Sequence, residues 1–125
     1  MNQVVNLAEK LAQFREQWTP HVVATLNDYH LKVVRLQGAF VWHQHAETDE
    51  LFLVVSGNME IRLRDEKQGE TSVRLGAGDL YIVPRGVEHC PVAKAECQAL
   101  LIEPAGTLNT GDTGGARTVL NPRQI

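Results

Sequence analysis

The chain has 125 residues, which is enough for one domain with its own hydrophobic core and leaves no room for a second domain. Its 12 basic and 15 acidic residues are interspersed and give a formal net charge of −3, so the basic surface typical of a nucleic-acid-binding protein is missing. The N-terminus has no charged region followed by a long apolar core, and no window approaches about 18 apolar residues. We therefore expect a cytoplasmic protein with no nucleic-acid or membrane partner.

The first predicted element is a short amphipathic helix over residues 5–18. Asn6 and Glu9 resemble a capping box, and apolar residues then recur at helical spacing until Pro20. We expect the apolar face of this helix to cover one end or face of a sheet, and Trp18 is a weak candidate for a ligand contact.

A strand is predicted over residues 31–37, because the side chains there are mostly β-branched or aliphatic, and Gly38 indicates a bend or bulge. Unbroken alternation would place Arg35 and Gln37 on the face of the histidines that follow, whereas a bulge would turn them away. Both residues are therefore possible pocket residues, and a solvated arginine on an edge strand is an equally good interpretation of Arg35.

Two histidines then occur in a segment that otherwise predicts two strands joined by a polar turn. His43 and His45 are two residues apart, so along a strand their side chains project to the same side. Glu50 opens the second, apolar strand and could approach both imidazoles from there. Glu47 and Asp49 lie in the same turn, and a bulge would change which carboxylate faces inward.

Further strands complete a β-rich pattern. Gly57 and Asn58 predict a hairpin turn, and residues 59–64 alternate between apolar and polar side chains as in a half-buried strand. The arginines of this region, Arg62 and Arg64 among them, are interpreted as ordinary solvated charges.

A third imidazole follows the next predicted strand. Residues 80–83 predict a buried strand, and a Pro-Arg-Gly turn then leads to His89. Residues 92–96 predict a polar connection and residues 98–102 a further core strand. Residues 105–125 predict a mobile, loop-like tail that could lie over a barrel mouth or a neighbouring subunit.

The two cysteines form no CxxC pair, and we interpret both as small buried side chains. Cys90 follows His89 directly and would point away from it in a regular strand, so it is a poor ligand candidate. The other cysteine is Cys97.

Seven to nine short strands with one leading helix are typical of an antiparallel sandwich or barrel. The glycines, histidines, glutamate and proline resemble the two-part signature of the cupin superfamily, in its type-2 form. The residues that carry the resemblance are Gly38, His43, His45, Glu50 and Gly57, followed by Gly78, Pro84, Gly86 and His89. One departure is Ala93, where many cupins have an asparagine that is not a metal ligand. The resemblance implies an all-β, jelly-roll-like β-barrel as a single domain over residues 1–125, with its core at 31–104.

The resemblance also implies a metal site formed by His43, His45, Glu50 and His89. Three imidazoles and a carboxylate suit one divalent transition metal, either Fe, Mn, Ni, Zn or Co, and suit calcium or magnesium poorly. In an octahedral ion this set leaves two positions free for a small-molecule ligand. Cupins of this kind are commonly homodimers, so we expect a homodimer here.

The predicted function is a metalloenzyme that acts on a small polar metabolite, with isomerase, lyase or dioxygenase chemistry left open. Tyr81 and Glu103 are the candidate acid and base residues, although core packing of Tyr81 and a surface position of Glu103 at a strand end are the favoured interpretations. A binding module without turnover is the second hypothesis.

A sugar-phosphate isomerase-like activity is a third hypothesis, and it requires a cationic phosphate site. The sequence offers only Arg35, Arg85 or the pair Arg62 and Arg64 for that purpose. Apolar side chains are expected to line the pocket and also the outer face of the barrel. Those expected in the pocket are Phe40, Phe52, Val54, Tyr81 and Val83, and those expected to face a second sheet or a partner subunit are Trp42, Leu51, Leu53 and Val55.

Overall fold

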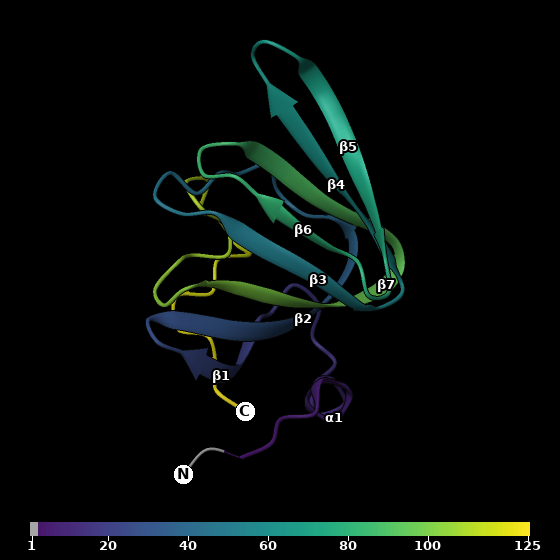
Figure 1. Ribbon diagram of the computed structural model, residues 1–125, viewed down its shortest axis with the longest axis vertical. Coiled ribbons are helices and arrows are strands. Elements are labelled where there is room, and N and C mark those ends of the chain that lie inside the picture. The colour runs from purple at the N-terminus through teal and green to yellow at the C-terminus, as the bar shows by residue number, and fades with distance from the viewer. Residues whose placement is uncertain (1–2) are drawn as a thin grey trace.

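The computed structural model describes residues 3–125, and it confirms the all-β class with one short helix in the described part (Figure 1). The helix and strands, in chain order, are α1 (Leu7–Leu11), β1 (His21–Leu26), β2 (Tyr29–Ala39), β3 (Glu50–Ser56), β4 (Asn58–Asp65), β5 (Gly69–Gly76), β6 (Leu80–Val83) and β7 (Glu88–Pro104). No helix among these residues is long and apolar enough to cross a membrane.

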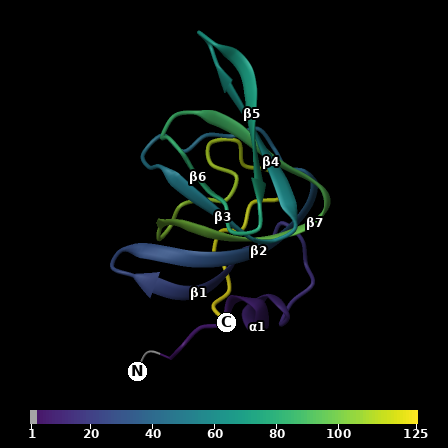
Figure 2. The same cartoon turned by 45° about the vertical axis from the view of Figure 1, so that its right-hand side comes forward.

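Strand β7 connects the two parts of the sheet. The strand order is β1-β2-β7-β3-β6, and β4 pairs with β5 and with β7, all antiparallel. The first part of β7 pairs with β4 and its second part with β3, while β2 pairs with both parts. The β4–β5 hairpin projects from one end of the molecule, and α1 lies at the other end near the C-terminus (Figures 1 and 2). The polar connection predicted at residues 92–96 is therefore wrong, because both halves of one long strand find partners.

The predicted hairpin at Gly57 and Asn58 is also wrong. Strand β3 pairs with β6 and β7, whereas β4 pairs with β5 and β7, so the two consecutive strands belong to different parts of the sheet. Gly57 has a φ of +86°, and a Cβ there would lie 3.0 Å from the carbonyl oxygen of Glu96. The glycine marks a corner at which the chain passes closely over another strand.

Helix α1 is shorter than the predicted helix over residues 5–18. Asn6 caps it as expected, because its side chain accepts a backbone N–H three residues on at 2.9 Å. The Arg35 guanidinium donates to the carbonyls of Leu11 at 2.8 Å and Phe14 at 3.0 Å. A buried guanidinium needs such acceptors, and it takes carbonyls that a longer helix would have used for its own hydrogen bonds.

Two apolar cores lie on opposite faces of the strands. The larger core is inside the barrel and includes Leu36, Phe52 and Ile61, while the second lies under α1 and includes Leu11 and Val33. Two of the residues expected to face a second sheet or a partner instead pack against this second core, namely Leu53 and Val55. The N-terminal segment therefore covers part of the outer face.

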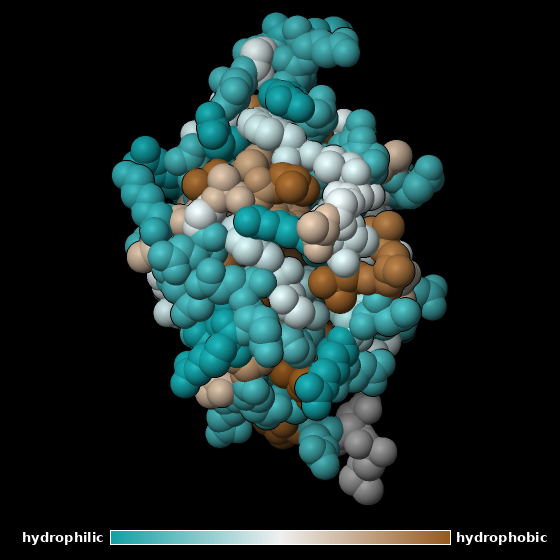
Figure 3. All heavy atoms as spheres, turned by 180° about the vertical axis from the view of Figure 1, so that it is seen from behind, coloured by the Kyte–Doolittle hydropathy of each residue, from teal (hydrophilic) through white to brown (hydrophobic). Residues whose placement is uncertain are grey.

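Strand β6 is an edge strand and is not buried as predicted. Leu80 is 58% exposed and Ile82 is 48% exposed, while Val83 is buried. The strand ends the order of the sheet and pairs only with β3, so its outer face has no covering element among the described residues. Seen from the side opposite to Figure 1, hydrophobic side chains are exposed in separate patches framed by polar ones (Figure 3).

Candidate metal centre

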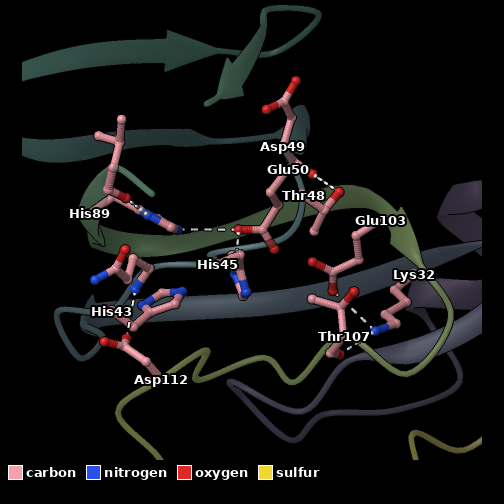
Figure 4. A network of polar contacts seen from close by, with 12 residues as sticks. Lys32, His43, His45, Thr48, Asp49, Glu50, His89, Glu103, Thr107 and Asp112 are labelled. Carbon is pink, nitrogen blue, oxygen red and sulfur yellow. Dashed lines mark hydrogen bonds and ion pairs between the residues drawn. The ribbon is translucent and has the colours of Figure 1, made fainter. Parts of the chain in front are cut away.

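Four buried side chains converge on one point inside the barrel. His43, His45, Glu50 and His89 each offer a ligand atom, and these atoms all lie within 4.8 Å of one another. The side chains come from three places in the chain: the segment after β2, the first residue of β3 and the second residue of β7. The three rings and the carboxylate point toward one another (Figure 4). The convergence expected from the sequence is therefore present.

The segment that carries the first two histidines is not a regular strand, contrary to the prediction. Strand β2 ends at Ala39, after a register shift at Gly38, and His43 pairs with His89 in an isolated antiparallel bridge. In this bridge the backbone N–H of each histidine donates to the backbone carbonyl of the other, at 3.0 and 2.9 Å. The bridge holds two of the four residues at a fixed separation, while His45 still faces the same interior.

Backbone carbonyls set the tautomers of two rings. Nδ1 of His43 lies 2.9 Å from the carbonyl oxygen of Val41, and Nδ1 of His89 lies 3.0 Å from that of Val87. A carbonyl oxygen can only accept a hydrogen bond, so both Nδ1 atoms carry a proton. In the neutral ring Nε2 is then left with a free lone pair, which is the state that a metal requires.

The Glu50 carboxylate lies close to the Nε2 atoms of two of the three histidine rings. Its Oε1 lies 3.2 Å from Nε2 of His89 and 3.2 Å from Nε2 of His45. Within residues 3–125 Nε2 of His45 makes no hydrogen bond. A neutral His89 would place an acceptor against an acceptor, so the group needs a second proton on the ring or a cation among the ligand atoms. The residues present therefore fit a transition metal ion.

Burial and charge set the protonation of the site. Burial lowers the pKa of His43 to about 4, and the charge of His89 acts in the same direction. Burial by itself would raise the pKa of Glu50, but the facing His45 and His89 side chains hold that pKa well below its usual range. At neutral pH His43 is thus a neutral ligand and Glu50 is an anionic one.

Glu103 is buried next to this group, and its favoured interpretation as a surface residue is wrong. It is 0% exposed, and its Oε1 accepts from Lys32 Nζ at 3.0 Å, in an ion pair that is itself buried. Burial raises the pKa of Glu103 well above its usual range, and the charge of Glu50 adds to this shift. Figure 4 shows Glu103 between Glu50 and Lys32. The signal in the sequence was a lysine inside the apolar run of β2, which needs a buried partner.

Tyr81 lies on β6 opposite Phe52 and packs against the interior core. Within residues 3–125 it makes no hydrogen bond to the four converging side chains. This position agrees with core packing, the interpretation that the sequence favoured.

Of the three carboxylates near the turn, Glu50 is the one that faces inward. Glu47 is exposed, and Asp49 accepts a hydrogen bond from the backbone N–H of Arg85 at 2.9 Å. The Asp49 carboxylate points away from the histidines (Figure 4). The choice of Glu50 over its neighbours agrees with the geometry.

The arginines considered for a phosphate site each face a carboxylate instead. The pairs are Arg35 with Glu96 at 2.8 Å, Arg62 with Glu70 at 2.7 Å, Arg64 with Glu88 at 2.7 Å and Arg85 with Asp49 at 3.8 Å. These arginines do not line the pocket that contains His43 and Glu50. The sugar-phosphate hypothesis therefore lacks the cationic site that it requires.

The C-terminal segment packs against the histidine segment. The N–H of Asp112 donates to the Gln44 carbonyl at 3.2 Å, and the Gln44 N–H donates back to the Asp112 carboxylate at 2.9 Å. The Thr113 hydroxyl donates to the Trp42 carbonyl at 2.6 Å. The tail is loop-like as predicted, and it supplies the hydrogen bonds that the histidine segment lacks from a neighbouring strand.

Comparison with known proteins identifies related chains. A family model described as "Cupin domain" matches residues 30–103. The uncharacterized protein YdbB of Bacillus subtilis (strain 168) is 30% identical over 89 residues, which are 71% of this chain and 75% of that protein. The crystal structure of a cupin-2 domain containing protein from Shewanella frigidimarina NCIMB 400 is 46% identical, with a TM-score of 0.76, over 81% of this chain and 94% of that chain.

A more distant structure shares the fold alone. Hydroquinone 1,2-dioxygenase PnpCD in complex with Fe3+ is 18% identical, with a TM-score of 0.71, over 80% of this chain and 32% of that chain. Another PnpCD structure, in complex with Cd2+ and 4-hydroxybenzonitrile, is 19% identical, with a TM-score of 0.63, over 93% of this chain and 72% of that chain.

Proposed function

The chain belongs to the cupin domain family, and from that premise we propose that it binds one divalent transition metal ion through His43, His45, Glu50 and His89. The observation that carries the proposal is the contact of the Glu50 carboxylate with two imidazole nitrogens at 3.2 Å, inside a group of buried ligand atoms. Three nitrogen ligands and one oxygen ligand favour Fe, Mn, Ni, Zn or Co.

We propose that the protein is a metalloenzyme acting on a small molecule. When bound, the ion would polarise an oxygen of the substrate. The Val41 and Val87 carbonyls orient two of the imidazoles, and the barrel walls exclude water from them. Glu103 is the better acid candidate of the two, because it lies buried beside Glu50 and burial raises its pKa.

The proposed metal centre is compatible with several classes of reaction. Isomerase, lyase and dioxygenase chemistry all agree with a metal that keeps open positions. The shared fold of PnpCD, a hydroquinone 1,2-dioxygenase with Fe3+ in its structure, supports the inclusion of an iron dioxygenase among these options. A binding module without turnover is the alternative, and it is favoured by the mostly apolar lining of the pocket. We also propose a homodimer, with the exposed apolar side chains of β6 as the contact.

Metal analysis tests the proposal directly. Protein purified without a nickel column should contain close to one transition metal ion per chain. His45→Ala and His89→Ala should each lose the metal while the far-ultraviolet circular dichroism spectrum stays unchanged. His21→Ala is the matched control, because this buried ring stacks on Phe14 at 3.9 Å, away from the four converging side chains. A wild-type protein that takes up no divalent transition metal would refute the proposal.

A further inference from the structure

The pocket that contains His43 and Glu50 has mostly apolar walls. Eight of the eleven residues that line it are apolar. Leu36, Phe52 and Leu101 in these walls belong to the interior core of the barrel. The body of any ligand in this pocket would therefore contact hydrocarbon.

Two aromatic rings complete the wall beside His43. Trp18 and Phe40 stack with their centroids 4.7 Å apart, and Phe40 meets the His43 ring edge-on at 5.5 Å. The indole N–H of Trp18 donates to the carbonyl of Gln37 at 3.0 Å, so the polar atom of this ring is already engaged. What remains for a ligand is the flat apolar surface of the rings.

Asn109 is the third polar residue of the wall, after His43 and Glu50, and its side chain already has hydrogen-bond partners within the protein. The side-chain amide of Asn109 donates to the Arg117 carbonyl at 2.8 Å, and its oxygen accepts the Val119 N–H at 2.8 Å. A ligand with many hydroxyl groups would lose its hydrogen bonds to water and find few replacements. The polar atoms left to recognise a ligand are those of the proposed metal centre.

The pocket also has no cation to receive a phosphate. Among residues 3–125, no lysine or arginine lines it, and the nearby Lys32 is held in a buried ion pair with Glu103 at 3.0 Å. Glu50 adds a negative charge of its own. An anionic group held away from the metal would therefore be buried without a counter-ion.

We infer that the pocket takes a compact, largely apolar molecule with an oxygen donor, a hydroxyl, enol or carbonyl, at the end that reaches the metal, and with no phosphate. This inference rests on the proposed metal function and narrows it. It differs from the small polar metabolite that the sequence led us to expect, because the walls offer hydrocarbon and aromatic surface in place of free hydrogen-bonding groups.

Matched probes test the inference on the full chain loaded with Co2+. Isothermal titration calorimetry should show that phenol binds at least about tenfold more tightly than phenyl phosphate, which has the same ring and an added charge. Glucose, which is uncharged and rich in hydroxyl groups, should bind more weakly than phenol by a similar factor. Binding of phenyl phosphate or glucose as tight as that of phenol would overturn the inference.

A pair of adjacent valines provides the matched variants. Val34 lines the pocket, whereas Val33 points to the opposite face of β2 and lies in the core under α1, and both are buried. Val34→Thr should weaken phenol binding by about tenfold, because it replaces a methyl group of the wall with a hydroxyl group. Val33→Thr makes the same chemical change and should leave phenol affinity unchanged. Equal effects of the two variants on phenol affinity would overturn the inference, and thermal unfolding of both controls for folding.

Failure of the metal proposal is separable from failure of this inference. Cobalt uptake is measured first, and its absence would refute the metal function alone. Phenol titration of the metal-free protein then tests whether the apolar wall binds a ligand. Phenol binding that Val34→Thr weakens would support the inference, and the absence of phenol binding would overturn it. Cobalt uptake with no preference for phenol would leave the metal function standing and remove the proposed class of ligand.

Discussion

At the scale of single residues, the surroundings of His43 give the site a measurable dependence on pH. Its pKa lies at about 4 in the folded protein and at 6.5 in the unfolded chain. As the pH falls, the unfolded chain therefore binds a proton on His43 at a higher pH than the folded protein does. The stability that His43 contributes above pH 6.5 is lost as the pH falls from 6.5 toward 4. For this 2% exposed side chain we predict a loss of up to about 3 kcal/mol in the free energy of unfolding of the metal-free protein.

Urea unfolding at pH 7 and pH 4.5 measures this effect. The control is His43→Phe, which keeps a ring of similar size and cannot titrate. The variant should lose less stability than the wild type over this pH interval, whatever its stability at pH 7. Equal losses in the two proteins would contradict the assignment of the lowered pKa to His43.

A second prediction at this scale concerns the carboxylate ligand. Glu50→Gln should weaken metal binding at least about tenfold, because the loss of even a supporting partner of a metal ligand has an effect of that size. Glu47→Gln removes the same charge from an exposed residue of the neighbouring turn and should leave the affinity unchanged. Competition with a chromogenic chelator measures both affinities. The reverse ranking would show that the fourth ligand has been misassigned.

The proposed ligands could be found from the sequence, whereas their buried neighbours could not. His43, His45 and Glu50 lie close together in the sequence around one turn, and the resemblance to the cupin signature joins His89 to them. Glu103 was placed on the surface, because no local pattern reveals that Lys32, 71 residues away in the chain, lies against it. Such a pair depends on strand register between distant segments, which alternation alone does not supply.

At the scale of elements, the C-terminal segment holds the histidine segment in place. Gly111 has a φ of +53°, and a Cβ there would overlap the carbonyl oxygen of Gln44 and lie 3.1 Å from Cδ2 of the His43 ring. We predict that Gly111→Ala displaces this contact and weakens metal binding by about tenfold, because it disturbs the support of a ligand.

The control for this prediction is Gly114→Ala. Gly114 also has a positive φ of +66°, but a Cβ there would meet no atom within 4 Å. The variant therefore introduces similar backbone strain without the overlap, and it should keep the affinity of the wild type. If Gly111→Ala and Gly114→Ala weaken metal binding equally, the tail does not support the site.

Strand alternation and the helix cap were readable from the sequence, and element ends and pairings were not. The cap at Asn6 is a local interaction and is present as predicted. The helix ends early because Arg35, from β2, binds the carbonyl of its last residue, Leu11, and that of Phe14 beyond it, which is a tertiary contact. The corner at Gly57 was taken for a hairpin, because a glycine at a turn looks the same whether the next strand pairs with the previous one or leaves it.

At the scale of the whole molecule, the exposed apolar edge of the sheet predicts self-association. Leu80 is 58% exposed on the edge strand β6, and burial of such a residue against a second copy would remove apolar surface from water. Analytical ultracentrifugation should find a dimer, and Leu80→Lys should shift it toward the monomer. Leu26→Lys is the matched control, because Leu26 is similarly exposed (59%) but lies at the end of β1, which is at the opposite end of the strand order from β6. A monomeric wild-type protein would contradict this prediction.

The all-β class of the whole chain was predicted from its pattern of short strands, and the cupin fold from its resemblance to the cupin signature. The strand order was beyond that pattern, because β7 joins both parts of the sheet along 17 residues in which the sequence predicted a polar connection and one shorter strand. The apolar character of the pocket was expected in general terms. Trp18 was only a weak candidate for a ligand contact and Asn109 was not considered, because the irregular segment after α1 and the loop-like tail carry these two residues to the site.

The claim on which this account depends is that three imidazoles and one carboxylate hold a single ion. X-ray absorption spectroscopy of the metal-loaded protein tests it most directly, because imidazole ligands give a characteristic scattering pattern. For the wild type we predict a shell of nitrogen and oxygen ligands at about 2.0–2.2 Å with three imidazoles, and no such shell in His89→Ala, which should not retain the metal. A spectrum with fewer than two imidazoles, or one that His89→Ala leaves unchanged, would contradict the account.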